Sequence, residues 1–212
     1  PASLIYHSSI TLPTATSFFP RAINLLNDTV FPDVVVYNSI LSGLARFSQP
    51  DPVFLVFNQL RQQGLKPDAH SLSSLIKACV EITHNGMAHG VSVNLGFVKN
   101  AFLISGLIEN YSKNGLLTGA EVCFQDNRCL DSVVWTSMIN GYVWNNEFDK
   151  AKDVFKEMRG LGLETNEFTL TTMLGGVLEV KEGEQIHGFS QKIGFLNGIS
   201  ICLSNRSERA HV

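Results

Sequence analysis

The sequence matches itself at a fixed offset of 98 residues, and no other feature restricts the fold as strongly. Residues 34–65 and 132–163 align without insertion or deletion. Val35, Val36, Ser39, Gly43, Asp51, Val56, Phe57, Gly64 and Leu65 return as Val133, Val134, Ser137, Gly141, Asp149, Val154, Phe155, Gly162 and Leu163. The same offset carries His89, Gly90, Ser92, Gly96 and Phe97 onto His187, Gly188, Ser190, Gly194 and Phe195. This regularity predicts an array of small structural repeats.

Short polar turns divide the 98-residue period into three units. Residues 34–68, 69–100 and 101–131 form the first set, with lengths of 35, 32 and 31 residues. Residues 132–166 and 167–200 continue the series with 35 and 34 residues. Residues 1–33 are expected to form an N-terminal segment with a degenerate short repeat, and residues 201–212 an off-pattern tail.

Each unit carries two amphipathic helical patterns. In residues 132–166 the first pattern consists of Trp135, Met138, Ile139 and Tyr142, and the second of Phe148, Ala151, Val154, Phe155 and Met158. The Asn145-Asn146 pair separates the two patterns, and short acceptors stand where the next first helix begins, at Asp33, Asp68, Asp131 and Asn166. Because one hairpin cannot bury its apolar faces alone, the units are expected to stack into an all-α solenoid.

Charge, cysteine content and hydropathy restrict what such an array does. The formal net charge is −3 and the isoelectric point about 6.1, so binding to nucleic acid would have to rest on individually placed side chains or on basic segments elsewhere. The four cysteines form no C-x-x-C pair and are expected to be reduced, buried thiols. No apolar run approaches the ~20 residues that span a membrane, so no membrane association is expected.

Several strings in the chain resemble the pentatricopeptide repeat (PPR) family of plants. Residues 34–41 read VVVYNSIL, which is similar to the family's hairpin opening, V-V-T-Y-N-T-L-I. Leu60, Gly64, Pro67 and Asp68 resemble its close, M-x-x-x-G-x-x-P-D. The alternating unit lengths, with LIKAC at 75–79 and QIHG at 185–188, resemble the PLS subfamily. By this resemblance 34–68 and 132–166 are standard repeats, 69–100 and 167–200 long-type repeats, and 101–131 a short-type repeat.

The resemblance implies a right-handed α-solenoid of about five stacked antiparallel hairpins that binds single-stranded RNA, one base per repeat, without a cofactor. It assigns base reading to the fifth and last residues of a unit, and base packing to an apolar residue beside them. The implied pairs are Asn38 with Asp68 for U, Ser105 with Asp131 for G, and Thr136 with Asn166 for A. Val35, Phe102 and Val133 would pack on the bases. The long-type units offer Ser73 with Asn100 and Thr171 with Ser200, and the implied target is 5′-U-x-G-A-x-3′.

The same polar residues also have a purely structural interpretation. Asp68, Asp131 and Asn166 are good helix caps. Ser105 and Thr136 are also ordinary polar residues for a solvated helix face. The residues alone favour capping, whereas the resemblance favours base reading, which capping does not prevent.

No catalytic motif accompanies the repeats. Cys79, His84 and His89 lie close together in the sequence, but their spacing fits no usual zinc site. A zinc deaminase needs an H-x-E…P-C-x-x-C signature, and neither half occurs. Phosphate-binding and nucleophile-elbow motifs are absent as well. The chain is therefore expected not to be an enzyme and to hold no metal. In C-to-U editing, a partner in the editing complex would supply the deaminase.

The N-terminal composition bears on the compartment. Residues 1–27 hold no acidic residue and only one arginine among many serines and threonines, which resembles the tail of an organelle transit peptide. A degenerate N-terminal segment explains this composition equally well. The expectation is a monomeric protein of organellar RNA processing, in the mitochondrion or alternatively the chloroplast. A protein-binding helical scaffold and a truncated PPR product remain as alternatives, although the tetratricopeptide pattern W-x₂-L-G-x₂-Y is absent.

Overall fold

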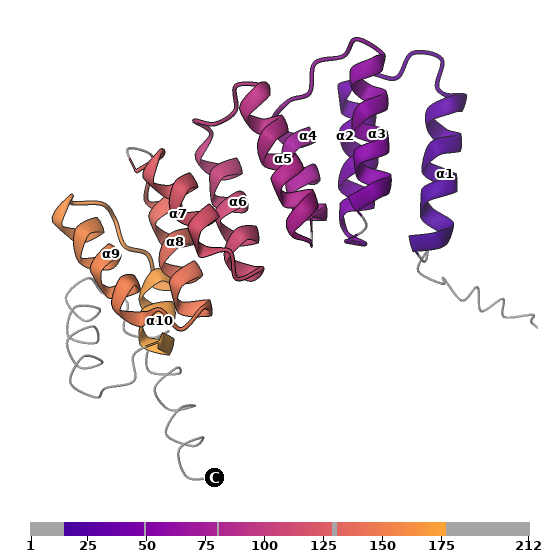
Figure 1. The fold of residues 1–212 in the computed structure, drawn as a ribbon. Helices are drawn as coiled ribbons and strands as arrows, with labels where there is room; N and C mark the ends of the chain where they lie inside the picture. The colour runs from indigo at the N-terminus through magenta and orange to yellow at the C-terminus, as the bar shows by residue number, and fades with distance from the viewer. Residues whose placement is uncertain (1–14, 49, 80, 129–130, 177–212) are drawn as a thin grey trace, which may run out of the picture. The chain divides into compact units, whose positions relative to one another are not determined.

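The computed structural model describes residues 15–48, 50–79, 81–128 and 131–176 of the chain. Every regular element in these ranges is an α-helix (Figure 1). The helices belong to two compact units, with the boundary between Ala78 and Cys79. The expected tail at 201–212 and most of the expected unit at 167–200 lie outside the described residues.

The first unit contains α1 (Ala15–Asp28), α2 (Val34–Ala45), α3 (Pro50–Gln62) and α4 (Ala69–Ala78). Helix α2 packs against α3, its hairpin partner, and against α4, the first helix of the next hairpin. Helix α1 also contacts α2. The N-terminal segment is therefore helical from Ala15 onward, with Pro20 inside the helix.

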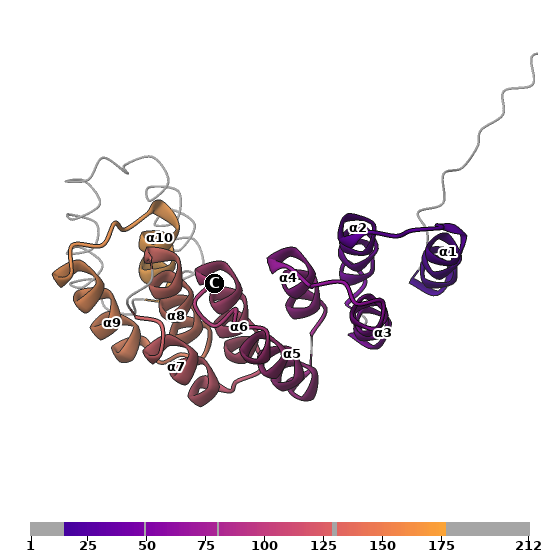
Figure 2. The ribbon, with the colours of Figure 1, turned by 90° about the horizontal axis from the view of Figure 1, so that it is seen from above.

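The second unit contains α5 (Ile82–Asn94), α6 (Ala101–Lys113), α7 (Leu117–Gln125), α8 (Ser132–Trp144), α9 (Phe148–Gly160) and α10 (Glu167–Gly176). Helix α8 packs against α6 and α10, while α7 and α9 pack against α8 from the other layer. Seen from above, α6, α8 and α10 form one row and α5, α7 and α9 the other (Figure 2). This succession of helical hairpins confirms the predicted solenoid class. None of the described helices is long and apolar enough to cross a membrane.

The predicted apolar stripes form the core between these layers. In α8, Trp135, Met138 and Ile139 have no exposed surface, and Tyr142 is nearly as buried. The stripe of α9 is buried at Ala151, Phe155 and Met158, whereas Phe148 and Val154 are partly exposed. The burial of these side chains stabilises the stacked helices far more than helix propensity does.

Equivalent glycines end the second helices of the two matching copies. Gly64 and Gly162 have φ values of 73° and 72°, a conformation that residues with a Cβ rarely adopt. In each copy the next residue donates its backbone N–H back across the helix end, from Leu65 to the Leu60 carbonyl and from Leu163 to the Met158 carbonyl. The repeated glycine thus fixes how each hairpin closes.

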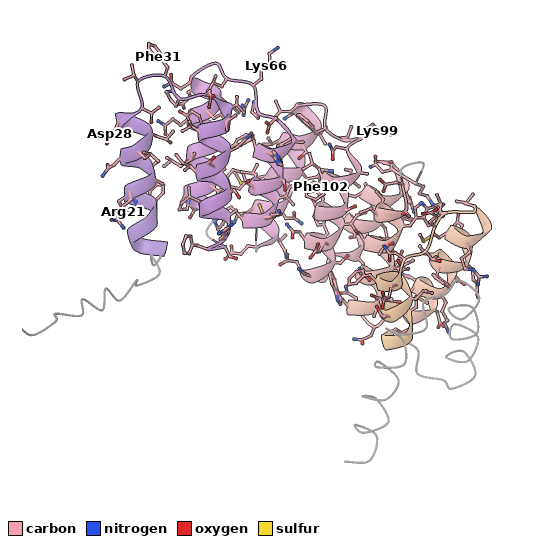
Figure 3. The ribbon with its side chains drawn as sticks, turned by 180° about the vertical axis from the view of Figure 1, so that it is seen from behind. Arg21, Asp28, Phe31, Lys66, Lys99 and Phe102 are labelled. Atoms are coloured by element: carbon pink, nitrogen blue, oxygen red, sulfur yellow. The ribbon has the colours of Figure 1, made fainter. Side chains whose placement is uncertain are left out.

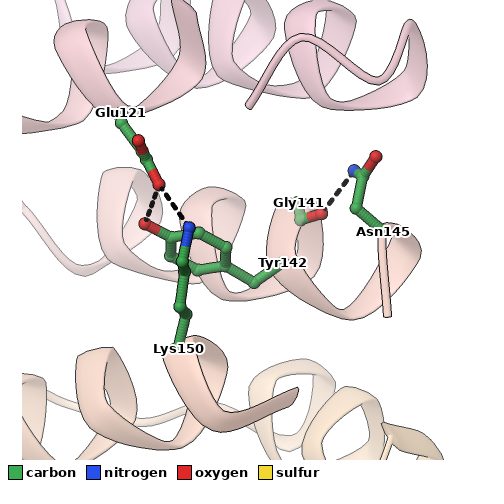
Figure 4. Close-up of polar contacts among 5 residues, drawn as sticks. All are labelled: Glu121, Gly141, Tyr142, Asn145 and Lys150. Atoms are coloured by element: carbon green, nitrogen blue, oxygen red, sulfur yellow. Dashed lines mark hydrogen bonds and ion pairs between the residues drawn. The ribbon is translucent and has the colours of Figure 1, made fainter. Parts of the chain in front are cut away.

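A polar contact joins three helices of the second unit (Figure 4). The Tyr142 hydroxyl on α8 donates to Glu121 Oε1 on α7 at 2.9 Å, and Lys150 Nζ on α9 lies 3.2 Å from the same oxygen. Burial and the bond to Glu121 raise the pKa of Tyr142, so the phenol stays neutral. The contact links the α6–α7 hairpin to the α8–α9 hairpin on the side of the second helices.

Helices α6 and α8 approach closely at Gly141. A Cβ at this position would overlap the Ser112 hydroxyl and lie 3.0 Å from Ser112 Cβ. Asn145 secures the approach by donating to the carbonyls of Ser112 and Gly141, at 2.9 and 2.8 Å. Glycine at 141 therefore allows the first helices of adjacent hairpins to pack face to face.

Replacing Gly141 by alanine should lower the free energy of unfolding by about 1–3 kcal/mol, because the added methyl overpacks the contact between α6 and α8. Gly90→Ala is the matched control, since Gly90 is also helical but a Cβ there meets nothing within 4 Å. The control should be neutral or stabilising by about 0.5–1 kcal/mol. Urea denaturation followed by circular dichroism measures both, and equal effects of the two alanines would disprove the close approach.

Candidate nucleic-acid interface

The four predicted caps each begin a first helix. Asp33 accepts the Val36 amide and Asp68 the Ser71 amide, both at 2.9 Å. Asp131 accepts the Val133 amide at 2.9 Å, and Asn166 the Thr169 amide at 2.8 Å. The capping interpretation is therefore confirmed. It also places the last residue of one unit beside the first helix of the next.

Asp68 also bonds to its predicted partner in the first unit. Asn38 Nδ2 lies 3.1 and 3.0 Å from the two carboxylate oxygens of Asp68. The Ser71 hydroxyl donates to Asn38 Oδ1 at 2.6 Å. All three residues lie on or beside α2 and α4, the two packed first helices of the first unit. The structure thus brings Asn38 and Asp68 together and adds a third polar residue to them.

The second copy has a similar arrangement at the equivalent residues, which lie 98 positions later in the chain. The hydroxyls of Thr136 on α8 and Thr169 on α10 are 2.8 Å apart. Thr169 Oγ1 also donates to Asn166 Oδ1 at 2.8 Å. Thr136 and Asn166 are therefore linked through Thr169, where Asn38 and Asp68 bond directly.

The third predicted pair is built differently. Ser105 donates its hydroxyl to the Ala101 carbonyl one turn earlier on α6, at 2.7 Å, and Asp131 caps α8 at Val133. Val134, which is fully buried, stands where Ser71 and Thr169 stand in the other two sites. Without a hydroxyl at this position, the serine and the aspartate are not bridged.

The apolar residues predicted to pack on bases are exposed. Val35, Phe102 and Val133 are 69%, 60% and 46% exposed, although each lies in the first turn of a helix whose other apolar residues are mostly buried. Figure 3 shows Phe102 at the start of its helix. An exposed apolar side chain can pack on the face of an unstacked base, and a nearby polar pair can bond to the edge of that base.

Asp68 is ionised in this setting. Partial burial favours the neutral acid, but hydrogen bonds from the Ser71 amide, the Asn38 amide, the Ser71 hydroxyl and the His70 amide outweigh it and lower the pKa of Asp68. The group at the end of residues 34–68 is therefore a pure hydrogen-bond acceptor at neutral pH, whereas Asn166 in the matching copy carries both a donor and an acceptor.

The two units predicted to be long-type show no bonded pair of the predicted reading residues within the described part of the chain. Ser73 lies buried on α4, Asn100 caps α6 through the Leu103 amide, and Thr171 donates to the Phe168 carbonyl. Ser200 lies outside the described residues. Their role as reading pairs stays a prediction.

Sequence reasoning missed Ser71 and Thr169. Both are the third residue of a first helix, both are hydroxyl residues, and both are completely buried. The 98-residue offset relates Ser71 to Thr169. A hydroxyl residue therefore recurs at one repeat position, and this recurrence is visible in the sequence. It was overlooked because a serine or threonine there resembles an ordinary helix-start residue.

Among the described residues, one further group of reactive side chains surrounds His89. Cys123 and Tyr111 flank His89, with Tyr111 Oη 3.1 Å from Nδ1 and Cys123 Sγ 3.8 Å from Nε2. Burial raises the pKa of Cys123 to about 12, so its thiol is not a nucleophile at neutral pH. Cys79 and Cys123 are buried and are not joined in a disulfide, as predicted for these two residues. Within the described part of the chain no group of three or more His, Cys, Asp or Glu residues could hold a metal ion.

Relatives of this chain are repeat proteins of plants. A pentatricopeptide repeat-containing protein of Arabidopsis thaliana, named as mitochondrial, is 28% identical over 176 residues, covering 80% of this chain and 26% of that protein. Another, named as chloroplastic, is 31% identical over 180 residues, covering 80% of this chain and 29% of that protein. The chain thus spans less than a third of the length of these two relatives.

Solved structures share the fold. The pentatricopeptide repeat protein PPR10 in complex with an 18-nt psaJ RNA element matches with a TM-score of 0.65 and 19% identity, over 82% of this chain and 27% of that one. PPR10 from maize matches with a TM-score of 0.64 and 22% identity, over 93% of this chain and 34% of that one. The sequence model of the PPR repeat family matches residues 32–81 and 130–179, so these two segments are similar to the repeats of that family.

Proposed function

We propose that this chain binds single-stranded RNA as part of a PPR array, with one base facing each hairpin. The observation that carries the proposal is the polar network that recurs at Asn38–Asp68 and at Thr136–Asn166, each beside an exposed valine. A structural cap alone would not require a polar residue on the preceding first helix, nor an exposed apolar residue next to it. Together they offer a hydrogen-bonding edge and an apolar face to an unstacked base.

The proposed bases are those that the family resemblance implies, and the polarity of these groups is compatible with each of them. Uracil presents an N3–H donor between two carbonyl acceptors. The ionised Asp68 can accept a hydrogen bond from the uracil N3–H. The Asn38 amide has a second N–H to donate to a uracil carbonyl. Adenine presents an amino donor beside a ring acceptor, which suits the Asn166 amide together with the Thr136 hydroxyl. Guanine presents two N–H donors, which suits Asp131 beside Ser105. The proposed target is 5′-U-x-G-A-x-3′.

The biological setting proposed is organellar RNA processing, such as recognition of a C-to-U editing site by a PLS-type array. Relatives carry mitochondrial and chloroplastic names, and PPR10 is known in complex with an RNA element. In this proposal the repeats occupy 34–68, 69–100, 101–131, 132–166 and 167–200, and the chain acts as a guide. Any deaminase would come from a partner protein.

The test is binding to a randomised single-stranded RNA pool, followed by titration of selected sequences. We expect enrichment of U-x-G-A, and tighter binding of that RNA than of a scrambled RNA of the same composition. Binding should weaken with salt only modestly, because an acidic chain gains little from counterion release. Equal binding of U-x-G-A and the scrambled RNA would disprove base reading, and a failure to bind any RNA would favour the protein-scaffold alternative.

A further inference from the structure

The hydroxyls of Ser71 and Thr169 make contacts that a helix cap does not need. In a reciprocal cap, the third helical residue bonds back to the capping residue, as Ser71 Oγ does with the Asp68 amide at 3.3 Å. Ser71 makes its much shorter bond, 2.6 Å, to Asn38 on the neighbouring first helix. Thr169 likewise reaches Thr136 on the neighbouring helix at 2.8 Å.

In the Thr136 network, these bonds fix the direction of every proton. The Thr169 backbone N–H donates to Asn166 Oδ1, so that atom must be the amide oxygen and not the nitrogen. The Thr169 hydroxyl donates its only proton to the same oxygen. The bond between the two threonine hydroxyls must then be donated by Thr136. Thr136 consequently keeps only lone pairs for a further partner, and Asn166 keeps only N–H groups.

In the Asn38 network, the hydroxyl at the equivalent position supports one orientation of an amide. Asn38 faces a carboxylate that only accepts, so its nitrogen points to Asp68. The Ser71 hydroxyl on the other side lies 2.6 Å from Asn38 Oδ1 and 3.1 Å from Asp68 Oδ1. By donating to Asn38 Oδ1, it holds the amide in the orientation that the carboxylate favours. Both hydroxyls are completely buried, so water does not compete for these bonds.

We infer that Ser71 and Thr169 are positioning residues that set the hydrogen-bond polarity of the preceding reading pair and thereby its base discrimination. This inference rests on the proposed function. The chain contains its own contrast, because Val134 occupies this position after Ser105 and Asp131 and cannot orient either group. Base discrimination therefore depends on three residues at each of the two sites that carry Ser71 or Thr169, and on two residues at the site where Val134 replaces the hydroxyl.

The experiment measures base preference of the full-length chain with short synthetic RNAs that carry U-x-G-A or a single replacement at U or at A. Ser71→Ala should reduce the preference for U over C by about three- to ten-fold, the worth of one neutral hydrogen bond, and leave the preference for A over G unchanged. Thr169→Val should do the reverse. Thr169→Ser restores the hydroxyl and should retain the preference for A.

The control separates positioning from capping. Asp33→Ala removes the cap of α2, where Val36 stands at the third position, without touching either network. It should lower stability and leave both base preferences intact. Loss of stability in Ser71→Ala with an unchanged U preference, or an equal loss at every base, would overturn the inference while the proposed function stands. No base preference in the unmodified chain would overturn the proposed function, and the inference with it.

Discussion

Exchanging Asn38 for threonine and Asp68 for asparagine should change the preferred base at the first recognition position from uracil to adenine. The double variant recreates the Thr136–Asn166 pair in the first unit, where Ser71 already supplies the hydroxyl that Thr169 provides in the second copy. The pair then presents lone pairs from the threonine and N–H groups from the asparagine, which complement adenine. Asparagine also caps helices well, so α4 should keep its cap.

Fluorescence anisotropy with A-x-G-A and U-x-G-A RNAs measures this exchange. We expect about a ten-fold preference for the adenine RNA, or ~1.4 kcal/mol, in place of the original preference for uracil. The preference at the position read by Thr136 and Asn166 is the internal control and should not change. Equal weakening on all RNAs would show that the two residues support the fold and do not read the base.

Replacing Trp135 by alanine should lower the free energy of unfolding of the second unit by about 3–5 kcal/mol, the cost of a large cavity in a packed core. Trp135 has no exposed surface, and its ring meets Phe124 edge to face at 4.9 Å between centroids. Its indole N–H donates to the Arg128 carbonyl at 3.1 Å. Removing the ring therefore loses both the packing between α7 and α8 and a partly buried hydrogen bond.

The other tryptophan is the matched control. Trp144 lies at the end of the same helix and is 46% exposed, with Lys113 Nζ 5.3 Å from its ring centroid. Trp144→Ala should cost about 0.5–1 kcal/mol, the worth of an exposed cation–π contact. Urea denaturation followed by far-ultraviolet circular dichroism compares the two variants. Similar midpoints for both would mean that Trp135 does not anchor the core.

Much of the fold was predictable because repeat periodicity and helix ends depend on local chemistry. Asp33, Asp68, Asp131 and Asn166 indicated the starts of α2, α4, α8 and α10, and each does cap the helix that follows. The break at Asn145-Asn146 lies directly after Trp144, where α8 ends, and Asn146 has a φ of 61°. Side chains that hydrogen-bond to neighbouring backbone groups can be recognised from the sequence, because both partners lie within a few residues of each other.

The networks around the reading pairs were less predictable, because they join residues about 30 positions apart. As a reading pair, Asn38 and Asp68 were indicated only by family resemblance. The recurring hydroxyl at Ser71 and Thr169 did not by itself show that Ser71 would contact both residues of the pair. Ser105 and Asp131 were predicted as an equivalent pair, yet their surroundings differ because Val134 replaces the hydroxyl. Such contacts depend on how adjacent hairpins stack, which is a tertiary property.

The capping residues have two roles, helix capping and the proposed base reading, and the first role limits how the second can evolve. Asp68 and Asn166 each hold the start of the next helix, so only the few side chains that cap well are tolerated there: aspartate, asparagine, serine and threonine. Aspartate and asparagine codons differ by a single nucleotide. One point mutation can therefore alter the last residue of a hairpin, and with it the proposed target, while the array keeps its fold.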